Sequence, residues 1–205
     1  MSVTGRIFVV SGPSGSGKST LIRETRAKVP ALGYSISHTS RPPRGQEKNG
    51  VDYHFVSRET FRKMIDRGDF VEWAEVYQDL YGTSVSSLKS QTQLGVDVIM
   101  DIDVQGASNM KSRFQEAILI YVLPPSLDIL EKRLRQRGTD DEESIRTRLQ
   151  KAAREIKHCV SYDYLLFNDE LDQAVEELKS IVIAERCRKS VRLYKAETLF
   201  NLAAH

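Results

Sequence analysis

The chain has 205 residues, of which 40% are hydrophobic and 28% are charged, and its formal net charge is +2. A chain of this length and composition can bury a sizeable core, so we expect one domain with appendages. Charges of both signs are interspersed along it. This argues against a nucleic-acid partner, because a general nucleic-acid binder usually carries a basic stripe.

No stretch approaches the ~20 apolar residues that a membrane helix requires, and the apolar start at 7–10 is too short for the core of a signal peptide. Cys159 and Cys187 lack the spacing of metal ligands. Their spacing leaves a disulfide open, but free buried thiols in a reducing compartment are the preferred interpretation. The sequence therefore predicts a soluble cytoplasmic protein with no membrane partner.

Residues 9–20 read VVSGPSGSGKST and contain the pattern G-x-x-x-x-G-K-[ST] of a phosphate-binding loop. A short apolar run at 6–10 predicts a buried strand before the loop, and a helix is expected to follow it as far as Val29. Strand, glycine-rich loop and helix together are the context that confirms this motif. The motif predicts that the chain binds a nucleoside triphosphate.

Each part of this loop has an expected role in holding phosphate. Gly12, Gly15 and Gly17 let successive N–H groups turn inward around an anion, and the start of the helix adds its positive dipole end. We expect Lys18 to reach the β- and γ-phosphates and the Ser19 hydroxyl to ligate Mg²⁺, the expected cofactor.

Residues 37–86 are predicted to form a small β-rich insertion between two pieces of the main sheet. A polar loop at 39–50 contains Pro42 and cannot be a regular helix. Trp73 is expected in the core. The other predicted elements are strands at 34–37, 51–56 and 70–76, a helix capped by Ser57 and closed by Gly68, and a turn at 81–83.

The second half of the chain alternates apolar strands with helical patterns. Such alternation is typical of a parallel sheet with helices on both faces, so we predict an α/β fold of the phosphate-loop type. The predicted strands are 95–103, 117–123 and 164–167. The first predicted helix is capped by Ser126, ends at Gly138 and has Leu127, Leu130 and Leu134 on one face. A second helix begins at a Thr139–Glu142 capping box. A long final helix is predicted through 175–182.

Arg41, Arg44, Tyr53 and Tyr81 are candidates for binding an acceptor substrate. Guanidinium forks and phenols suit a phosphate monoester. Solvated surface arginines are an equally good interpretation of Arg41 and Arg44 taken alone.

Arginines are dense between 133 and 148. Arg133 and Arg137 are four apart, hence on one helix face, and lie off the leucine stripe. The pattern favours a mobile lid that brings arginines onto a transferring phosphoryl group; a simple solvated helix face is the alternative.

Three acids lie at or beside the ends of predicted strands: Glu72, Asp101 and Asp103. Acids in such places can recognise base edges or hold metal-bound water. An apolar strand that runs into Asp101, on a chain with a phosphate loop, suggests a second strand pointing at the Mg²⁺-triphosphate, with Asp101 acting through water. Local salt bridges are the competing interpretation.

These stretches make the chain resemble the bacterial guanylate kinases over essentially its whole length. The resemblance lies in SGPSGSGKST, SHTSRPPRGQEKNGVDYHFV, FVEWAEVYQDLYGTS, VIMDIDVQGA, LEKRLRQRGTDDEESIRTRL and FNDE. Departures are mild, since Ser40 stands where the family often has Thr and Leu80 where it often has Tyr. Thr83 replaces a common Ser but keeps the hydroxyl.

The resemblance implies transfer of the γ-phosphoryl group of ATP to GMP, with Mg²⁺, in purine nucleotide metabolism; dGMP is a further expected substrate, and no oligomeric state is implied. It implies a core of 1–36, 87–125 and 159–205, a GMP-binding insertion of 37–86 and a lid of 126–158. The implied GMP site is Ser37, Arg41, Arg44, Glu47, Tyr53, Glu72, Tyr81, Thr83 and Asp103. The implied ATP site is Gly12, Pro13, Ser14, Gly15, Ser16, Gly17, Lys18, Ser19 and Thr20, with Asn168 near adenine. The implied catalytic residues are Lys18, Arg133, Arg137 and Arg148.

Two other functions stay open at this point. One is a non-enzymatic peptide-binding module on the same scaffold, which is expected to lose the loop glycines or the lid arginines, whereas Gly12, Gly17 and Lys18 are present. The other is a related kinase of a phosphorylated sugar. Glu72 and Asp103 argue against it, because a sugar has no guanine edge to read.

Overall fold

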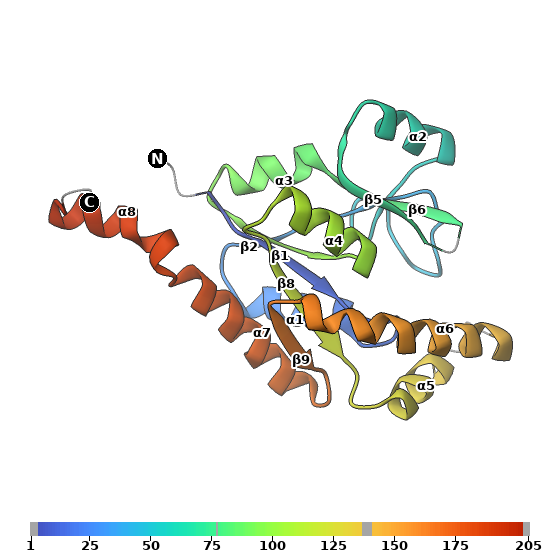
Figure 1. The fold of residues 1–205 in the computed structure, drawn as a ribbon. Coiled ribbons are helices and arrows are strands. Elements are labelled where there is room, and N and C mark those ends of the chain that lie inside the picture. The colour runs from blue at the N-terminus through green and yellow to red at the C-terminus, as the bar shows by residue number, and fades with distance from the viewer. Residues whose placement is uncertain (1–3, 77, 137–140, 203–205) are drawn as a thin grey trace.

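A five-stranded parallel sheet organises the protein (Figure 1), with strand order β2-β7-β1-β8-β9. The computed structural model describes residues 4–76, 78–136 and 141–202. All four neighbouring strand pairs run parallel, which confirms the predicted fold class. The strands are β1 (Ile7–Ser11), β2 (Leu32–Tyr34), β7 (Asp97–Asp101), β8 (Ile118–Leu123) and β9 (Tyr164–Phe167).

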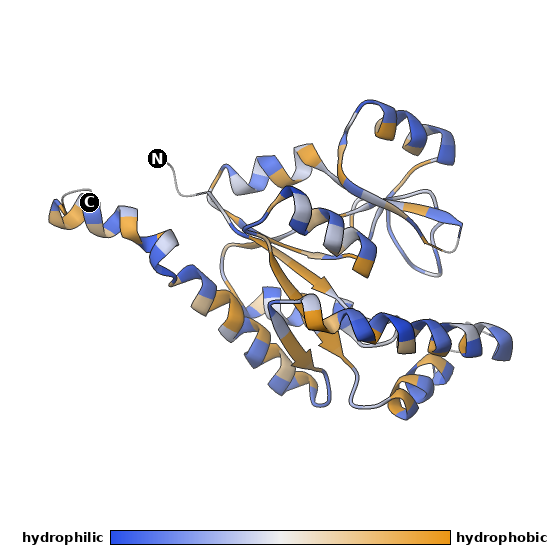
Figure 2. Ribbon diagram, viewed as in Figure 1, coloured by the Kyte–Doolittle hydropathy of each residue, from blue (hydrophilic) through white to orange (hydrophobic). Residues whose placement is uncertain are grey.

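Helices cover both faces of this sheet, because its strands are apolar on both sides (Figure 2). Along β1, Phe8 and Val10 face one core and Val9 faces the other, as expected for a strand with a period of two. The first core is closed by α1 (Lys18–Lys28) and α7 (Leu171–Arg186), and the second by α3 (Val85–Thr92) and α4 (Val104–Arg113).

The predicted β-rich insertion is a second sheet of four strands, in the order β4-β3-β6-β5. Its helix α2 (Arg58–Asp66) begins at the predicted Ser57 cap and packs Phe61 against Phe70 and Leu80. The strands are β3 (His38–Thr39), β4 (His54–Phe55), β5 (Phe70–Val76) and β6 (Asp79–Ser84). Of the predicted strands at 34–37 and 51–56, only Tyr34 and 54–55 lie in strands, and Tyr53 forms an isolated bridge with Asn49.

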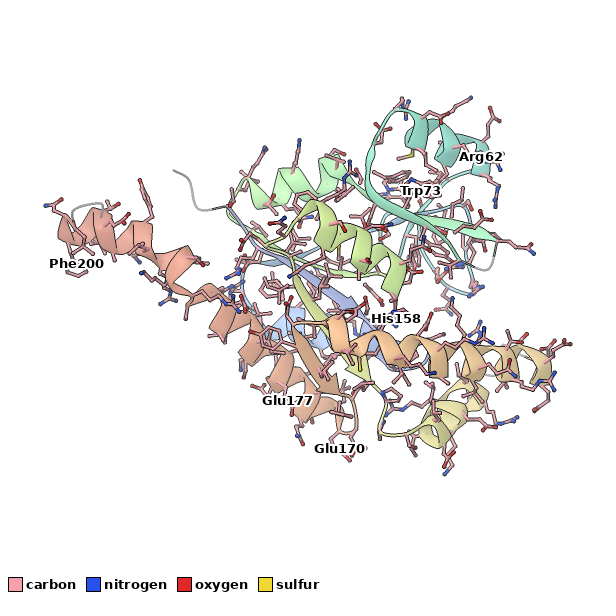
Figure 3. The ribbon with its side chains drawn as sticks, viewed as in Figure 1. Arg62, Trp73, His158, Glu170, Glu177 and Phe200 are labelled. Carbon is pink, nitrogen blue, oxygen red and sulfur yellow. The ribbon has the colours of Figure 1, made fainter. Side chains whose placement is uncertain are left out.

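The predicted turn at 81–83 is wrong, because these residues are the middle of β6. Gly82 serves close packing rather than a turn: a Cβ there would lie 2.9 Å from Phe70 Cδ1 and 3.1 Å from Phe61 Cζ. Trp73 is 42% exposed, so its predicted place in the core is also wrong (Figure 3). Glu72 and Ala74 point inward, and strand alternation directs the side chain between them to the other face.

Helices α5 (Leu127–Gln136) and α6 (Glu142–Glu155) form a hairpin beside the sheet, and a 3₁₀-helix (Ile156–Ser161) leads back to β9. Leu130 and Leu134 are buried against α6, whereas Leu127 is 44% exposed and does not belong to the buried stripe. The predicted capping box and helix end, Thr139 and Gly138, lie outside the described residues. The N-cap of α6 is Asp141, whose carboxylate accepts a hydrogen bond from Ser144 N at 2.8 Å.

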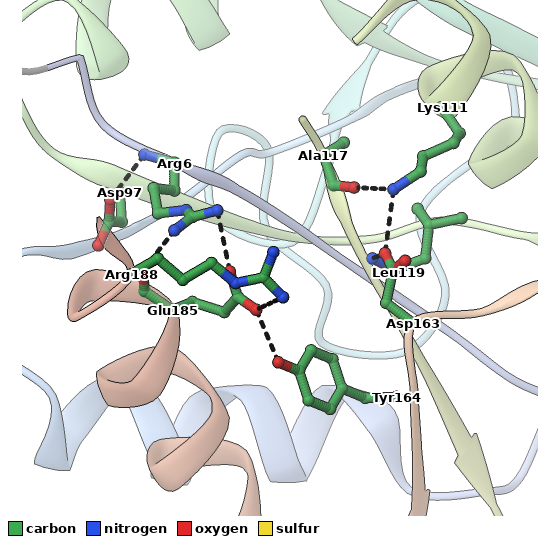
Figure 4. Close-up of polar contacts among 9 residues, drawn as sticks. All are labelled: Arg6, Asp97, Lys111, Ala117, Leu119, Asp163, Tyr164, Glu185 and Arg188. Atoms are coloured by element: carbon green, nitrogen blue, oxygen red, sulfur yellow. Dashed lines mark hydrogen bonds and ion pairs between the residues drawn. The ribbon is translucent and has the colours of Figure 1, made fainter. Parts of the chain in front are cut away.

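The predicted long helix through 175–182 is α7, which ends at Arg186, but it is not the final one, because α8 (Lys189–Phe200) follows it away from the body of the protein (Figure 1). A buried carboxylate fixes the end of α7 (Figure 4): Glu185 accepts from the Tyr164 hydroxyl at 2.6 Å and pairs with Arg6 at 2.9 Å and Arg188 at 2.8 Å. These contacts join β1, β9 and α7. Among the residues described, no helix is both long and apolar enough to cross a membrane.

Candidate active site

A cavity of about 660 Å³, here called the central cavity, opens at the carboxyl ends of β1 and β7. Ligands of open α/β sheets bind at this edge. The second sheet and helix α6 form its other walls. The predicted site residues that line it are Gly12, Ser14, Lys18, Ser37, Arg44, Tyr53, Glu72, Tyr81, Asp101, Asp103 and Arg148.

The loop between β1 and α1 has the backbone of an anion cradle. Gly17 occupies the N-cap of α1 with φ of 90°, a left-handed conformation that favours glycine. A side chain there would also collide with Asn168, since a Cβ would lie 2.3 Å from Nδ2. Because glycine has no capping side chain, the first-turn N–H groups of α1 are left to a ligand.

Lys18, Ser19 and Asp101 converge at the floor of the loop. Lys18 Nζ donates to the carbonyls of Gly12 at 2.8 Å and Pro13 at 3.2 Å, and lies 3.9 Å from Asp101 Oδ1. The Ser19 hydroxyl donates to Asp101 Oδ2 at 3.3 Å. Burial raises the pKa of Asp101, although Lys18 and Ser19 act against this shift.

A hydroxyl and a carboxylate are oxygen donors of the kind that Mg²⁺ prefers. Within the described ranges, no group of three or more His, Cys, Asp and Glu side chains could enclose a metal ion. This donor set fits an ion that is held largely by substrate phosphates and water, as Mg²⁺ usually is in kinases.

Arg41 is not a solvated surface arginine, since it is only 5% exposed. Its guanidinium donates two parallel hydrogen bonds to Glu47, both of 2.9 Å, and its Nε donates to the Tyr81 hydroxyl at 3.2 Å. Burial raises the pKa of Glu47, but bonds from Arg41 and the Arg44 backbone outweigh it and leave the pKa below its ordinary value. The charged pair therefore lies behind Tyr81, and Arg44 faces the cavity.

Glu72 is a buried carboxylate that lines the cavity from β5 of the second sheet, and it is 5% exposed. The Thr83 hydroxyl donates to its Oε1 at 2.7 Å. Burial raises the pKa of Glu72 to about 7, with Asp103 adding to the shift and Thr83 opposing it. Asp103 in turn caps α4, because its Oδ1 accepts from Gly106 N at 2.8 Å.

The predicted arginines of the α5–α6 hairpin occupy different places. Arg148 lines the central cavity, whereas Arg133 Nη2 donates to the backbone carbonyl of Asn168 at 3.0 Å, behind the phosphate loop. Arg137 lies outside the described residues. The sequence reasoning missed Lys151, which lines the cavity beside Arg148. The signal for it is the helical spacing of Ser144, Arg148, Lys151 and Glu155, which all line the cavity from one face of α6.

A family model for guanylate kinase matches residues 4–185 of this chain. The chain belongs to the guanylate kinase family. It is 46% identical to a guanylate kinase of Geobacter metallireducens over 188 residues, which cover 92% of this chain and 93% of that one. It is 45% identical to the guanylate kinase of Geobacter sulfurreducens over 202 residues, with 98% and 100% covered.

The fold agrees with that of a solved guanylate kinase. The crystal structure of guanylate kinase from Anaplasma phagocytophilum superposes with a TM-score of 0.79 at 30% identity, covering 98% of both chains. The family predicted from the sequence is thus confirmed.

Not every residue implied by the guanylate kinase resemblance lies on the cavity wall. Arg41 and Thr83 stand behind it and donate hydrogen bonds to Tyr81 and Glu72, which do line it. Glu47 accepts from Arg41 and from the backbone N–H of Arg44, which lines the cavity. Ser16 and Asn168 are bonded to each other at the back of the phosphate loop. The residues behind the wall hold the lining residues in place.

Proposed function

We propose that this member of the guanylate kinase family transfers the γ-phosphoryl group of ATP to GMP, giving ADP and GDP, in the purine nucleotide metabolism of the cytoplasm. One observation carries the proposal: the phosphate loop and the buried carboxylate of Glu72 face the same cavity from two different sheets. One wall suits a triphosphate, and the other suits a base with adjacent hydrogen-bond donors.

Residues 12–20 are our proposed ATP site. The N–H groups of the loop and the start of α1 would receive the phosphates, and Lys18 would turn from the Gly12 and Pro13 carbonyls to the β- and γ-oxygens. We assign Ser19 to Mg²⁺ directly and Asp101 through water. The ion, when bound, neutralises charge on the β- and γ-phosphates.

GMP, and dGMP with it, is proposed to bind between the second sheet and α4. Arg44, Tyr53 and Tyr81 would hold the phosphate, with the positive charge of Arg41 behind them. Burial and then Asp101 raise the pKa of Tyr53 well above its ordinary value, so its phenol keeps the proton that it donates.

The guanine base would contact carboxylates and hydroxyls of the second sheet and of the residue that caps α4. Guanine carries N1–H and N2–H₂ donors side by side, and a carboxylate offers two acceptors at matching separation. Glu72 is our candidate for this partner. Ser37 and Asp103 would supply further contacts from the cavity wall, and Thr83 would hold the Glu72 carboxylate from behind.

Phosphoryl transfer requires little covalent chemistry from the protein, so catalysis depends mainly on positioning the substrates and compensating their charge. We propose that Lys18, Arg133, Arg137 and Arg148 compensate the charge that develops on the transferring group. Residues 126–158 would act as a lid that closes over the cavity and excludes water, which would otherwise accept the phosphate. Residues 37–86 would form the GMP-binding part, and the rest of the chain the core.

A coupled assay for ADP formation tests the proposal with GMP, dGMP, AMP and IMP as acceptors. We expect ADP to form only when an acceptor is present, with GMP preferred over AMP. A peptide-binding module would give no GMP-dependent ADP, and a sugar-phosphate kinase would show no preference among the bases. Either result would overturn the proposed function.

A further inference from the structure

Helix α4 carries a buried glycine, Gly106, in its first turn. A helical backbone is open to every L-residue, and glycine is the poorest helix former after proline. The local conformation therefore gives no reason for a glycine at this position. Its surroundings supply one.

A side chain at position 106 would occupy the place of the Glu72 carboxylate. A Cβ built on Gly106 would lie 2.6 Å from Glu72 Oε2, 3.3 Å from Glu72 Cδ and 3.2 Å from Asp103 Oδ1. Carbon and oxygen atoms that are not bonded to each other normally come no closer than about 3.3 Å. The Glu72 carboxylate and a Cβ at position 106 cannot both occupy these positions.

The helix has little freedom to move back from Glu72. Ala107 and Met110 pack into the core against the large sheet, and Arg113 at the end of α4 donates from Nη1 to the Phe70 carbonyl of β5 at 3.0 Å. At the other end, the Asp103 cap holds Gly106 N at 2.8 Å. The carboxylate is the end of a rotatable side chain, so it is the group that would yield.

A displaced carboxylate would lose its orientation in the cavity. Thr83 holds Oε1 at 2.7 Å, which leaves Oε2 facing α4 across the space that Gly106 provides. Rotation about the Glu72 side chain would break the Thr83 bond or turn Oε2 away. The two acceptors would then no longer lie side by side toward a base.

We propose that Gly106 is a positioning residue for base specificity: its missing side chain is the space that lets Glu72 present both carboxylate oxygens to guanine. This inference rests on the proposed reading of guanine by Glu72. Gly106 itself need not touch the nucleotide. We expect its effect to be confined to the GMP side, because the phosphate loop follows β1 of the large sheet whereas Glu72 lies on β5 of the second sheet.

Gly106→Ala in the full chain is the test, with steady-state kinetics for GMP and for IMP, which lacks the N2 amino group. We expect KM for GMP to rise about 10- to 100-fold, the loss of hydrogen bonds to a charged group. The ratio of kcat/KM for GMP over IMP should fall, while KM for ATP stays unchanged. The thermal unfolding midpoint should be equal or higher, since alanine is the better helix former. Ser108→Ala, at an exposed position of the same helix, is the matched control and should change none of these values.

Two further variants keep the outcome decisive. In a Glu72→Gln background, Gly106→Ala should change the ratio of kcat/KM for GMP over IMP little, because the carboxylate that recognises guanine is already absent. If Gly106→Ala lowers the unfolding midpoint, adding Glu72→Ala should restore it by removing the atoms that collide. A normal GMP-to-IMP ratio in Gly106→Ala, an equal rise of both KM values, or no restoration would overturn the inference.

Glu72→Gln alone separates this inference from the proposed function. If Glu72→Gln leaves the GMP-to-IMP preference of the wild type intact, the proposed reading of guanine fails. If Glu72→Gln removes the preference and Gly106→Ala does not, only the role of Gly106 fails.

Discussion

The side-chain amide of Asn168 donates a hydrogen bond to the backbone carbonyl of Ser16 at 2.7 Å, and so ties the end of β9 to the phosphate loop. The backbone of Asn168 is itself fixed, because its N–H donates to the Leu123 carbonyl at 2.9 Å and its carbonyl accepts from Arg133 at 3.0 Å. One residue thus connects the loop, the large sheet and helix α5.

Asn168→Ala should loosen the peptide between Ser16 and Gly17 and so weaken ATP binding. We expect KM for ATP to rise about 10-fold, as for one lost hydrogen bond to a buried group, with KM for GMP nearly unchanged. Asn168→Asp should be worse than alanine, because its carboxylate would face the Ser16 carbonyl without a proton to donate. Initial rates at varied ATP and GMP measure both effects. Equal activity of the three proteins would show that the loop holds its shape without this bond.

Lys18→Ala should remove most turnover and leave the fold intact, because Lys18 Nζ bonds carbonyls of the loop itself and lies near Asp101, and Lys18 belongs to neither core of the large sheet. We expect kcat to fall by about 10²- to 10³-fold, the cost of losing one preorganised donor. Lys28→Ala is the matched control, since Lys28 pairs with Glu176 at the exposed far end of the same helix. Near-normal turnover of Lys18→Ala in the coupled assay would contradict the proposed triphosphate site.

Arg148→Ala should lower kcat far more than it weakens GMP binding, because we expect its contact with the phosphoryl group chiefly in the closed, charge-developing state. Arginines in this role contribute on the order of 10³ in rate or more. Arg146→Ala is the control, because Arg146 lies on the α5 side of α6. The same prediction stands for Arg137. A variant that raised only KM for GMP would show that the arginine binds substrate and does not assist transfer.

GMP affinity should depend on pH through Glu72, whose pKa is raised by burial to about 7. The ionised carboxylate is the form that accepts from guanine, so affinity should rise from pH 6 to 8 and binding should release a proton. The stability of the free protein should change with pH in the opposite direction. Because the pKa of Glu72 is higher in the folded state than its ordinary value of 4.5, its contribution to the free energy of unfolding is fully present below pH ~4.5 and is lost as pH rises through about 7.

Calorimetry of GMP binding in buffers of different ionisation enthalpy measures the released proton. Glu72→Gln should reduce both the proton release and the pH dependence to the part that the GMP phosphate contributes, since a phosphate monoester titrates near pH ~6, and it should narrow the kcat/KM gap between GMP and AMP. Proton release in Glu72→Gln equal to that of the wild type would show that Glu72 does not contribute to it.

The parts of the site that the sequence predicts well are those whose geometry is local. The phosphate loop and its flanking strand and helix depend on consecutive residues, and they lie where the motif requires. A glycine predicts a turn wrongly where it is needed for packing against residues that are distant in the sequence. Gly82 resembles a turn residue, but it allows Phe61 and Phe70 to lie against β6. The bond from Asn168 to Ser16 joins residues 152 positions apart, and no local pattern predicts it.

The second sheet packs on a small core built on Phe61, Phe70 and Leu80, and its strand β5 also places Val71 in the second core of the large sheet. Because the core around Phe61 is small, we expect α2 and the strands packed on it to have less local stability than the large sheet and to unfold before it. Backbone amides of β3 and β4 should therefore exchange with deuterium well before those of β1 and β8. Phe61→Ala, which leaves a cavity in this small core, should therefore unfold the proposed GMP-binding part and remove GMP binding, while the protein still binds ATP.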